Sequence, residues 1–150
     1  MTNSSLHTPN IADELAHDPG LLQVVVVSPA RPIYEGAAKS LIVEAASGSM
    51  GVLPRHADIV AALGAGPLRI QKADGSEDRF AVWGGFLKVG GLKVTILVDR
   101  AVGADEVIES EVKQELDETL QSLRHAKSDE DFANLLETRA WCQARLTLVR

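Results

Sequence analysis

Several residue types are scarce in this 150-residue sequence, and each scarcity excludes something. There is one cysteine, Cys142, so the chain cannot form an internal disulfide, and we expect a reducing compartment and a packing role for this thiol. Aromatic residues make up 4% of the chain, so a core must consist mainly of Val, Leu, Ile and Ala. No apolar run approaches the roughly 20 residues that span a bilayer. Composition therefore predicts a soluble, cytosolic-type chain.

Clustered positive charge is also missing. Lys and Arg total 15 against 21 Asp and Glu, for a net charge of −6, and the basic residues are scattered singly. Nucleic-acid binding needs clustered cations that displace counterions from phosphates, so we expect no nucleic-acid partner. Residues 1–20 contain no Lys or Arg and no long apolar run, which is unlike a signal or transit peptide. We expect these residues to form a mobile N-terminal extension.

Motifs for catalysis and metal binding are not found. The four histidines, His7, His17, His56 and His125, are far apart, and no pair has metal-ligand spacing. The sequence has no Gly-x-Ser-x-Gly elbow, no phosphate-binding Gly-x4-Gly-Lys loop and no dinucleotide fingerprint. Although His56 has charged neighbours, a histidine after a proline turn more often braces its loop than reacts. We therefore expect no catalytic residue and no bound metal.

Short apolar segments alternate with turn signals between residues 21 and 103. Leu21–Val27 is a β-branched run, and Asp74-Gly75 and Gly90-Gly91 are hairpin-turn signals. Turn signals every eight to twelve residues are typical of an antiparallel β-sandwich or flattened barrel. We expect Trp83 to be a core residue of this domain. The cluster Gly64–Pro67 predicts a further turn.

The pattern changes at Gly103, after which no proline or glycine occurs. Ser128 precedes three acidic residues, which is typical of a helix N-terminus, and residues 125–127 suffice only for a tight reversal. Residues 104–150 therefore predict an antiparallel α-helical hairpin, and the fold class is α+β. Trp141 on the second helix is either a packing residue or an exposed contact. The first helix should present a narrow apolar stripe of Ile108, Val112, Leu116, Leu120 and Leu123.

A resemblance to a known family rests on the glycine- and proline-rich stretch Gly48–Ile70. Its order, Gly48-x-x-Gly51-Val-Leu-Pro54-x-His56-Ala57 and then Gly66-Pro67-Leu-Arg-Ile70, resembles the epsilon subunit of the F-type ATP synthase. Trp83-Gly-Gly-Phe-Leu-x-Val89 and Val94–Leu97 extend the likeness at similar spacing. The motifs are specific as an ordered set and cover about residues 21–150. The loop also resembles epsilon subunits of alternate, ion-translocating F-type ATPases.

The resemblance implies a non-catalytic central-stalk subunit that couples the gamma subunit to the c ring for proton-driven ATP synthesis. Such a subunit is peripheral, on the cytoplasmic face of the bacterial cell membrane, as part of the complex. Two departures affect the expected contacts: Ser49 replaces an acidic residue of many relatives, and Pro54–Asp58 replaces Pro-Gly-His-Ala-Pro. By resemblance, the c-ring contact falls on Ser47, Gly48, Ser49 and Met50, and the gamma contact on His56 and Asp58.

The same resemblance implies that the hairpin can leave the sandwich and restrain ATP hydrolysis through transient contacts with the alpha and beta subunits. Arg139, Arg145 and Arg150 are candidates for these contacts, although they would also complement the C-terminal end of a helix dipole. Some relatives bind ATP on the hairpin, but within Leu135–Ala140 Leu136 stands where the resemblance implies a carboxylate. We expect no ATP binding there and no cofactor. A free-standing β-sandwich interaction module is the alternative function.

Overall fold

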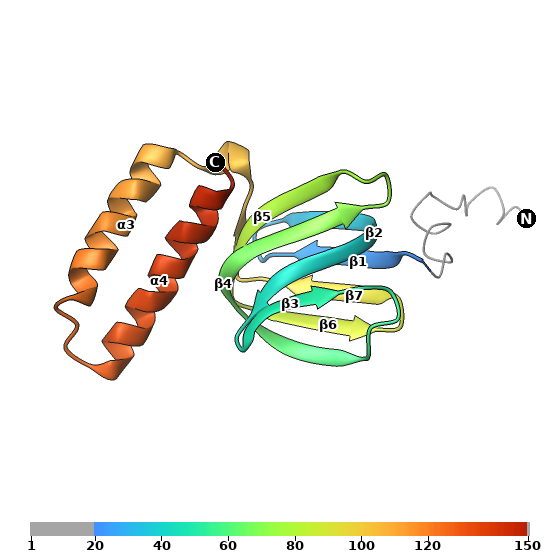
Figure 1. Cartoon of the computed structure of the whole chain (residues 1–150), viewed down its shortest axis with the longest axis horizontal. Coiled ribbons are helices and arrows are strands. Elements are labelled where there is room, and N and C mark those ends of the chain that lie inside the picture. Colours follow the sequence, from blue (N-terminus) through green and yellow to red (C-terminus); the bar gives the residue numbers. More distant parts are fainter. Residues whose placement is uncertain (1–19, 150) are drawn as a thin grey trace, which may run out of the picture.

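The computed structural model describes residues 20–149, so the predicted extension lies outside the described residues except for Gly20. A β-sandwich is followed by two helices that lie against one of its ends (Figure 1). The strands are β1 Leu22–Val27, β2 Pro32–Ala45, β3 Gly48–Val52, β4 Ile59–Lys72, β5 Glu77–Trp83, β6 Phe86–Gly90, β7 Lys93–Leu97 and β8 Arg100–Val102. A 3₁₀ turn η1, Ala104–Glu106, leads to helices α3, Glu109–Leu123, and α4, Asp129–Thr147.

The strands form one curled sheet in the order β3-β2-β1-β7-β6-β4-β5-β8. The long strand β2 also pairs with β4, which closes the sheet into the predicted sandwich or flattened barrel. The Asp74-Gly75 and Gly90-Gly91 turns occur as predicted, and Gly75 and Gly91 have φ of 91° and 61°. The fold class is confirmed. One pairing, β1 with β7, is parallel, whereas the others are antiparallel.

The sandwich core follows from the alternation of buried and more exposed residues along strands such as β1, because successive side chains point to opposite faces. In β1, for example, Leu22, Val24 and Val26 are buried while their neighbours are partly exposed. Trp83 is not part of this core, contrary to expectation, and packs instead at the junction with the helices. The buried core residues are Leu22, Val24, Val26, Ala38, Leu41, Val43, Val52, Leu63, Leu68, Ile70, Val82, Leu87, Val89, Val94, Ile96 and Val98.

Strand β4 runs without interruption through Gly64–Pro67, so the turn predicted there is wrong. The strand tolerates Pro67 within an antiparallel pair with Ala81 of β5. Gly66 is needed for close packing rather than for a turn, since a Cβ at this position would clash with the side chain of Glu44 on β2. Strand β4 therefore continues as one long strand that pairs with β2, β5 and β6.

The first helix begins later than predicted. Residues 104–106 form η1, and Val107 and Ile108 are extended, so α3 starts at Glu109. Val107 packs into both hydrophobic clusters of the helical region, and this tertiary contact overrides helix propensity. The predicted start of the second helix is confirmed, because the Ser128 hydroxyl accepts a hydrogen bond of 3.0 Å from the Asp131 amide.

The buried line of α3 is only partly the predicted one. Val112 is buried and Leu116 packs beside it, but Leu120 is 39% exposed and Thr119 is buried instead. Each step of four residues turns a helix by about 40° beyond a full turn, so a run of such steps drifts away from its partner. A step of three residues corrects the drift and brings Thr119 inward.

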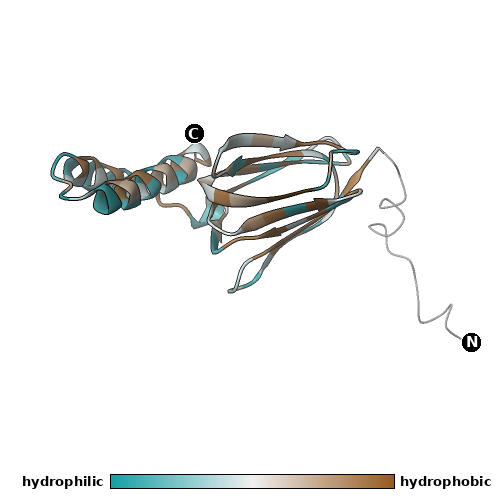
Figure 2. Ribbon diagram, turned by 90° about the horizontal axis from the view of Figure 1, so that it is seen from below, coloured by the Kyte–Doolittle hydropathy of each residue, from teal (hydrophilic) through white to brown (hydrophobic). Residues whose placement is uncertain are grey.

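Helix α4 lies between α3 and the sandwich (Figure 1). Trp141 and Ala144 of α4, with Leu148 just after the helix, are buried against Ala81 of β5, while Cys142 and Leu146 face Val112 of α3. In Figure 2, hydrophobic segments are concentrated in the strands, and the far end of the hairpin is mostly hydrophilic. Within residues 20–149, no helix is long and apolar enough to cross a membrane.

Candidate interaction surfaces and helical junction

An exposed row of apolar side chains crosses three strands on the outer side of the sandwich. Strand register places Ala62 of β4 opposite Phe86 of β6, and Phe86 opposite Leu97 of β7. Val60 lies two residues before Ala62 and therefore on the same side. Val60, Phe86 and Leu97 are 68%, 58% and 52% exposed. We call Val60, Ala62, Phe86 and Leu97 the apolar strip, and it is a candidate partner-binding surface.

Basic residues border the apolar strip. Lys88 pairs in register with Val60 on one side and with Thr95 on the other. Together with Lys93 and Gly90, Lys88 and Thr95 line a shallow cavity of about 240 Å³. The strip therefore combines an apolar centre with a positively charged margin, and an apolar centre with a polar rim is typical of protein interfaces.

The β4–β5 region has the opposite character. Its exposed charges pair with one another: Arg69 contacts Glu77 at 3.0 Å, and Lys72 contacts Asp78 at 3.3 Å. Such exposed pairs contribute little to stability, but they keep the surface hydrated. This side of the sandwich needs no partner to satisfy its charges.

The four residues predicted to contact the c ring lie at the β2–β3 hairpin. Ser47 is in the turn, and Gly48 begins β3 with φ of 129°, a conformation that favours glycine. Ser47, Gly48 and Ser49 are exposed, whereas Met50 is partly buried and packs against the sandwich core. The structure therefore brings the four residues together but presents only the first three to solvent.

The two residues predicted to contact gamma lie in the loop before β4. The side chain of Asp58 accepts a hydrogen bond of 3.1 Å from the Gly91 amide, which ties this loop to the β6–β7 turn. The ring Nδ1 of His56 lies 2.7 Å from the Ala57 carbonyl oxygen, and the His56 amide donates to Leu53. Both side chains brace the loop, and this loop leads directly into Val60 of the apolar strip.

Two tryptophans meet where α4 docks on the sandwich. Trp83 at the end of β5 and Trp141 of α4 have ring centroids 5.6 Å apart and an interplanar angle of 41°. The guanidinium of Arg100 on β8 lies 5.1 Å from the Trp83 centroid and 5.0 Å from that of Trp141. The Trp83 indole also donates a hydrogen bond of 2.5 Å to Glu137 of α4. These contacts hold α4 on the sheet through both packing and cation–π attraction.

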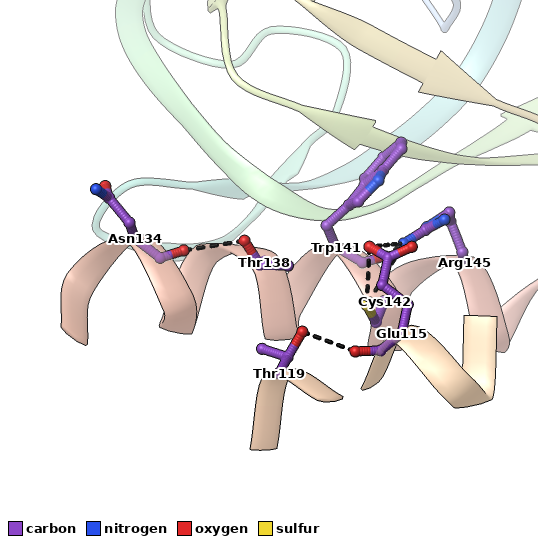
Figure 3. A network of polar contacts seen from close by, with 7 residues as sticks. All are labelled: Glu115, Thr119, Asn134, Thr138, Trp141, Cys142 and Arg145. Atoms are coloured by element: carbon purple, nitrogen blue, oxygen red, sulfur yellow. Dashed lines mark hydrogen bonds and ion pairs between the residues drawn. The ribbon is translucent and has the colours of Figure 1, made fainter. Parts of the chain in front are cut away.

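Trp141 also contacts Arg145, which links α4 to α3. The Arg145 guanidinium lies 5.0 Å from the Trp141 centroid and 2.8 Å from the Glu115 carboxylate of α3. The same Glu115 oxygen lies 3.5 Å from the Cys142 sulfur, and burial, reinforced by this carboxylate, raises the pKa of the thiol. Figure 3 shows Trp141 pointing from α4 toward the strands and Glu115 lying between the helices. We call Trp83, Arg100, Trp141, Arg145 and Glu115 the junction stack.

Two of the three arginines predicted to contact catalytic subunits are described. Arg145 is held within the junction stack with 14% of its side chain exposed, and Arg139 is partly buried. Arg150 lies outside the described residues. The sequence did not predict the junction stack, because its members are far apart along the chain and carry no local signal beyond two scarce tryptophans.

Among the described residues, no group of three or more His, Cys, Asp or Glu side chains could hold a metal ion. The features that are present are a β-sandwich with one apolar outer side and a helical hairpin docked at its end. These features favour a protein that binds a partner through its sandwich.

Residues 21–104 match the family model described as ATP synthase, Delta/Epsilon chain, beta-sandwich domain. An ATP synthase epsilon chain of Acinetobacter baumannii is 38% identical over 129 residues, which cover 86% of this chain and 93% of that one. An epsilon chain of Alkalilimnicola ehrlichii is 34% identical over 125 residues, covering 83% and 89%. A chain in the Euglena gracilis mitochondrial ATP synthase shares the fold, with a TM-score of 0.76, 18% identity and coverage of 96% and 89%.

The chain therefore belongs to the ATP synthase delta/epsilon family, and its relatives are epsilon chains. Members of this kind are non-catalytic subunits of ATP synthase, so the expectation that the chain is not an enzyme is confirmed by its family. The resemblance drawn from the motifs within Gly48–Ile70 and Trp83–Leu97 is also confirmed.

Proposed function

We propose that this epsilon subunit works in the central stalk, where its sandwich binds gamma and contacts the c ring and its hairpin restrains ATP hydrolysis. Family membership supports the assembly, and the apolar strip is the observation that carries the contact with gamma. In a bacterial cell the subunit would lie at the cytoplasmic face of the membrane, attached only through the complex, and would take part in proton-driven ATP synthesis.

Gamma docks on the apolar strip in this proposal. The strip supplies an exposed aromatic ring flanked by two branched apolar side chains, and interface centres are depleted of charge and enriched in aromatic residues. The loop that contains His56 and Asp58 leads directly into Val60 of the strip and is tied to the β6–β7 turn by the Asp58–Gly91 hydrogen bond, so gamma can contact both. Lys88 would lie at the margin of this interface.

A binding experiment with full-length variants tests the gamma contact. Val60→Ser together with Phe86→Ser should lower the affinity for purified gamma at least tenfold, because each buried apolar side chain contributes about 1.5–3 kcal/mol. Both side chains are largely exposed in the free subunit, so its stability should not change. The matched control is Ile108→Ser with Phe132→Ser, which are 57% and 45% exposed and lie outside the strip.

Binding that is equal in the two double variants would exclude the apolar strip as the gamma contact. Copurification also separates the two functions considered from the sequence. A central-stalk subunit should bring down gamma, whereas a free-standing interaction module should not.

The β2–β3 hairpin is the proposed contact with the c ring. Ser47, Gly48 and Ser49 are exposed at its turn, and Ser49→Arg would place a bulky charge in the contact without disturbing the core. We expect weaker association of the gamma–epsilon complex with the c ring and unchanged binding to gamma. Ser76→Arg, in the exposed β4–β5 turn, is the control. Equal association of both variants would exclude this turn.

The hairpin is proposed as a conformational brake. In the docked form Arg145 is held by Trp141 of its own helix and by Glu115 of α3, so it can reach alpha or beta subunits only after the hairpin has opened and α3 has separated from α4. Deleting residues 104–150 should therefore raise ATP hydrolysis by the reconstituted enzyme. Neutralising Arg139, Arg145 and Arg150 should reproduce part of the increase. Hydrolysis rates that do not change in either case would make the hairpin a structural appendage.

A further inference from the structure

The junction stack is a continuous series of contacts through all three parts of the molecule. Trp83 and Arg100 belong to the sandwich, Trp141 and Arg145 to α4, and Glu115 to α3. Neighbouring members lie within contact distance: 5.6 Å between the two indole centroids, 5.0 Å from each guanidinium to Trp141, and 2.8 Å from Arg145 to Glu115. Trp83 on β5 and Glu115 on α3 are joined in this series only through Trp141 and Arg145, so the energetic link proposed between them passes through α4.

Arg145 contacts both Trp141 of its own helix and Glu115 of α3. One face of its planar guanidinium lies over Trp141, and its N–H groups donate to Glu115, a combination that lysine cannot reproduce. Its side chain is 14% exposed, so losing Glu115 would leave a poorly hydrated cation without its counter-ion. A second cation, Arg100, stacks on the same indole and makes no salt bridge among the described residues.

Other carboxylates face this cluster. Glu106 and Glu111 line, with Arg100 and Arg145, a cavity of about 180 Å³ beside the stack. Glu106 is engaged by Arg31 at 2.5 Å, and Glu115 alone forms an ion pair with Arg145. Removal of the Glu115 charge should therefore weaken the stacking of Arg145 on Trp141. It should also weaken the contact between α4 and the sandwich.

We propose that the junction stack is a latch that couples two openings: α3 from α4, and α4 from the sandwich. The hairpin then leaves the sandwich as one cooperative unit instead of losing α3 first. The latch is a property of the isolated chain. Only its use in controlling hydrolysis rests on the proposed function.

The chain contains its own probes for the two openings. Cys142 is the single cysteine and is buried between α4 and α3, so its rate of reaction with a thiol reagent reports separation of the helices. The only two tryptophans, Trp83 and Trp141, both lie in the latch, so intrinsic fluorescence reports the contact of α4 with the sandwich. No engineered label is required.

Glu115→Gln is the decisive variant. The latch predicts that it raises the Cys142 labelling rate about tenfold and also shifts tryptophan emission to the red, although Glu115 lies on the helix farther from the sandwich. Glu109→Gln is the matched control, since it removes a carboxylate of the same helix that pairs with Lys113 at 3.1 Å outside the latch. The control should leave both signals at their wild-type values.

Trp83→Phe and Arg145→Lys complete the test. Each should raise labelling as Glu115→Gln does, and Trp83→Phe combined with Glu115→Gln should label no faster than the faster single variant, because either change opens the whole latch. Burial and the Glu115 carboxylate both raise the pKa of the Cys142 thiol, and Glu115→Gln removes the second cause, so faster labelling counts as opening only together with the fluorescence shift. Faster labelling of Glu115→Gln with unchanged fluorescence would overturn the proposal. The proposal would also be overturned if the fold increase in Cys142 labelling rate of the double variant equalled the product of the fold increases of the two single variants.

The reconstituted enzyme then separates the latch from the brake. If opened variants of the isolated chain change ATP hydrolysis, the latch regulates the motor. If Cys142 labelling and tryptophan emission change together in these variants but hydrolysis is unchanged, the latch is supported and the proposed inhibitory role is excluded.

Discussion

The sandwich and the hairpin are stabilised in different ways. The sandwich has one continuous core that draws residues from β1 to β7 and includes Leu68 and Ile70 at 0% exposure. The hairpin has two small clusters, one against the sheet at Ala81 and one between the helices at Val112. A domain with its own core can fold alone, whereas a helix pair with little buried area depends on what it docks against. The sandwich is thus the scaffold, and the hairpin is the part that can change its position.

Matched leucine truncations should show this difference most strongly. Leu68 in the sandwich and Leu146 in α4 are almost fully buried, at 0% and 1% exposure. Leu68→Ala should lower the free energy of global unfolding by about 2–5 kcal/mol. Leu146→Ala should instead increase Cys142 labelling while the β-sheet circular dichroism signal melts near the wild-type temperature. Equal loss of the sheet signal in both variants would show that the two parts unfold as one.

Removal of the hairpin should have a smaller effect on the sandwich. A chain that ends at Gly103 exposes Ala81 and the partly buried Trp83 and Val102, and we expect its sandwich to lose about 2 kcal/mol. It should still show β-type circular dichroism and a cooperative thermal transition. A disordered product would mean that α4 supplies an indispensable wall of the core.

The sequence predicted those parts of the fold that depend on local chemistry. Alternation along Leu22–Val27, the glycine turns at Gly75 and Gly91, and the Ser128 cap each depend on a few adjacent residues. The motif set around Gly48–Ile70 also predicted the family, and hence the sandwich and the hairpin.

Long-range packing was beyond prediction. Gly64–Pro67 has the composition of a turn but continues β4, because Gly66 accommodates Glu44 from another strand. Val107 is extended rather than helical because it packs against two hydrophobic clusters, one at the sheet and one between the helices. The apolar strip combines residues of three strands, and the junction stack joins Trp83 to Trp141, so neither had a contiguous sequence signal. The predicted contacts at Ser47–Met50, His56 and Asp58 stay predictions.

The hairpin should also respond to alkaline pH through Cys142. Burial raises the pKa of this thiol in the folded chain, so the unfolded chain releases the proton first as the pH rises. The stabilisation is fully present below the ordinary thiol pKa of about 8.5 and is lost as the pH rises toward the raised value, by at most about 1.4 kcal/mol per pH unit. Urea unfolding of wild type and Cys142→Ala across this range measures the loss.

The alanine variant should be less stable at every pH because part of a buried side chain is removed. Its free energy of unfolding should, however, fall less steeply with rising pH, because the contribution of the thiol is missing. Tyr34 in the sandwich also has a pKa raised mainly by burial, and both proteins share its contribution at higher pH. Identical slopes for the two proteins between pH 8 and 10 would exclude Cys142 as the source.

The smallest expected effect lies in the sandwich, at the loop before β4. Arg55 has φ of 71°, a left-handed conformation that costs a side chain about 1–2 kcal/mol. Arg55→Gly removes this strain but adds freedom to the unfolded chain, so the net gain in stability should be at most about 1 kcal/mol. Arg55→Ala is the control: it removes the exposed guanidinium but keeps the Cβ, and it should give no gain. Equal unfolding free energies for the glycine and alanine variants in urea would show that the backbone at this position stores no strain.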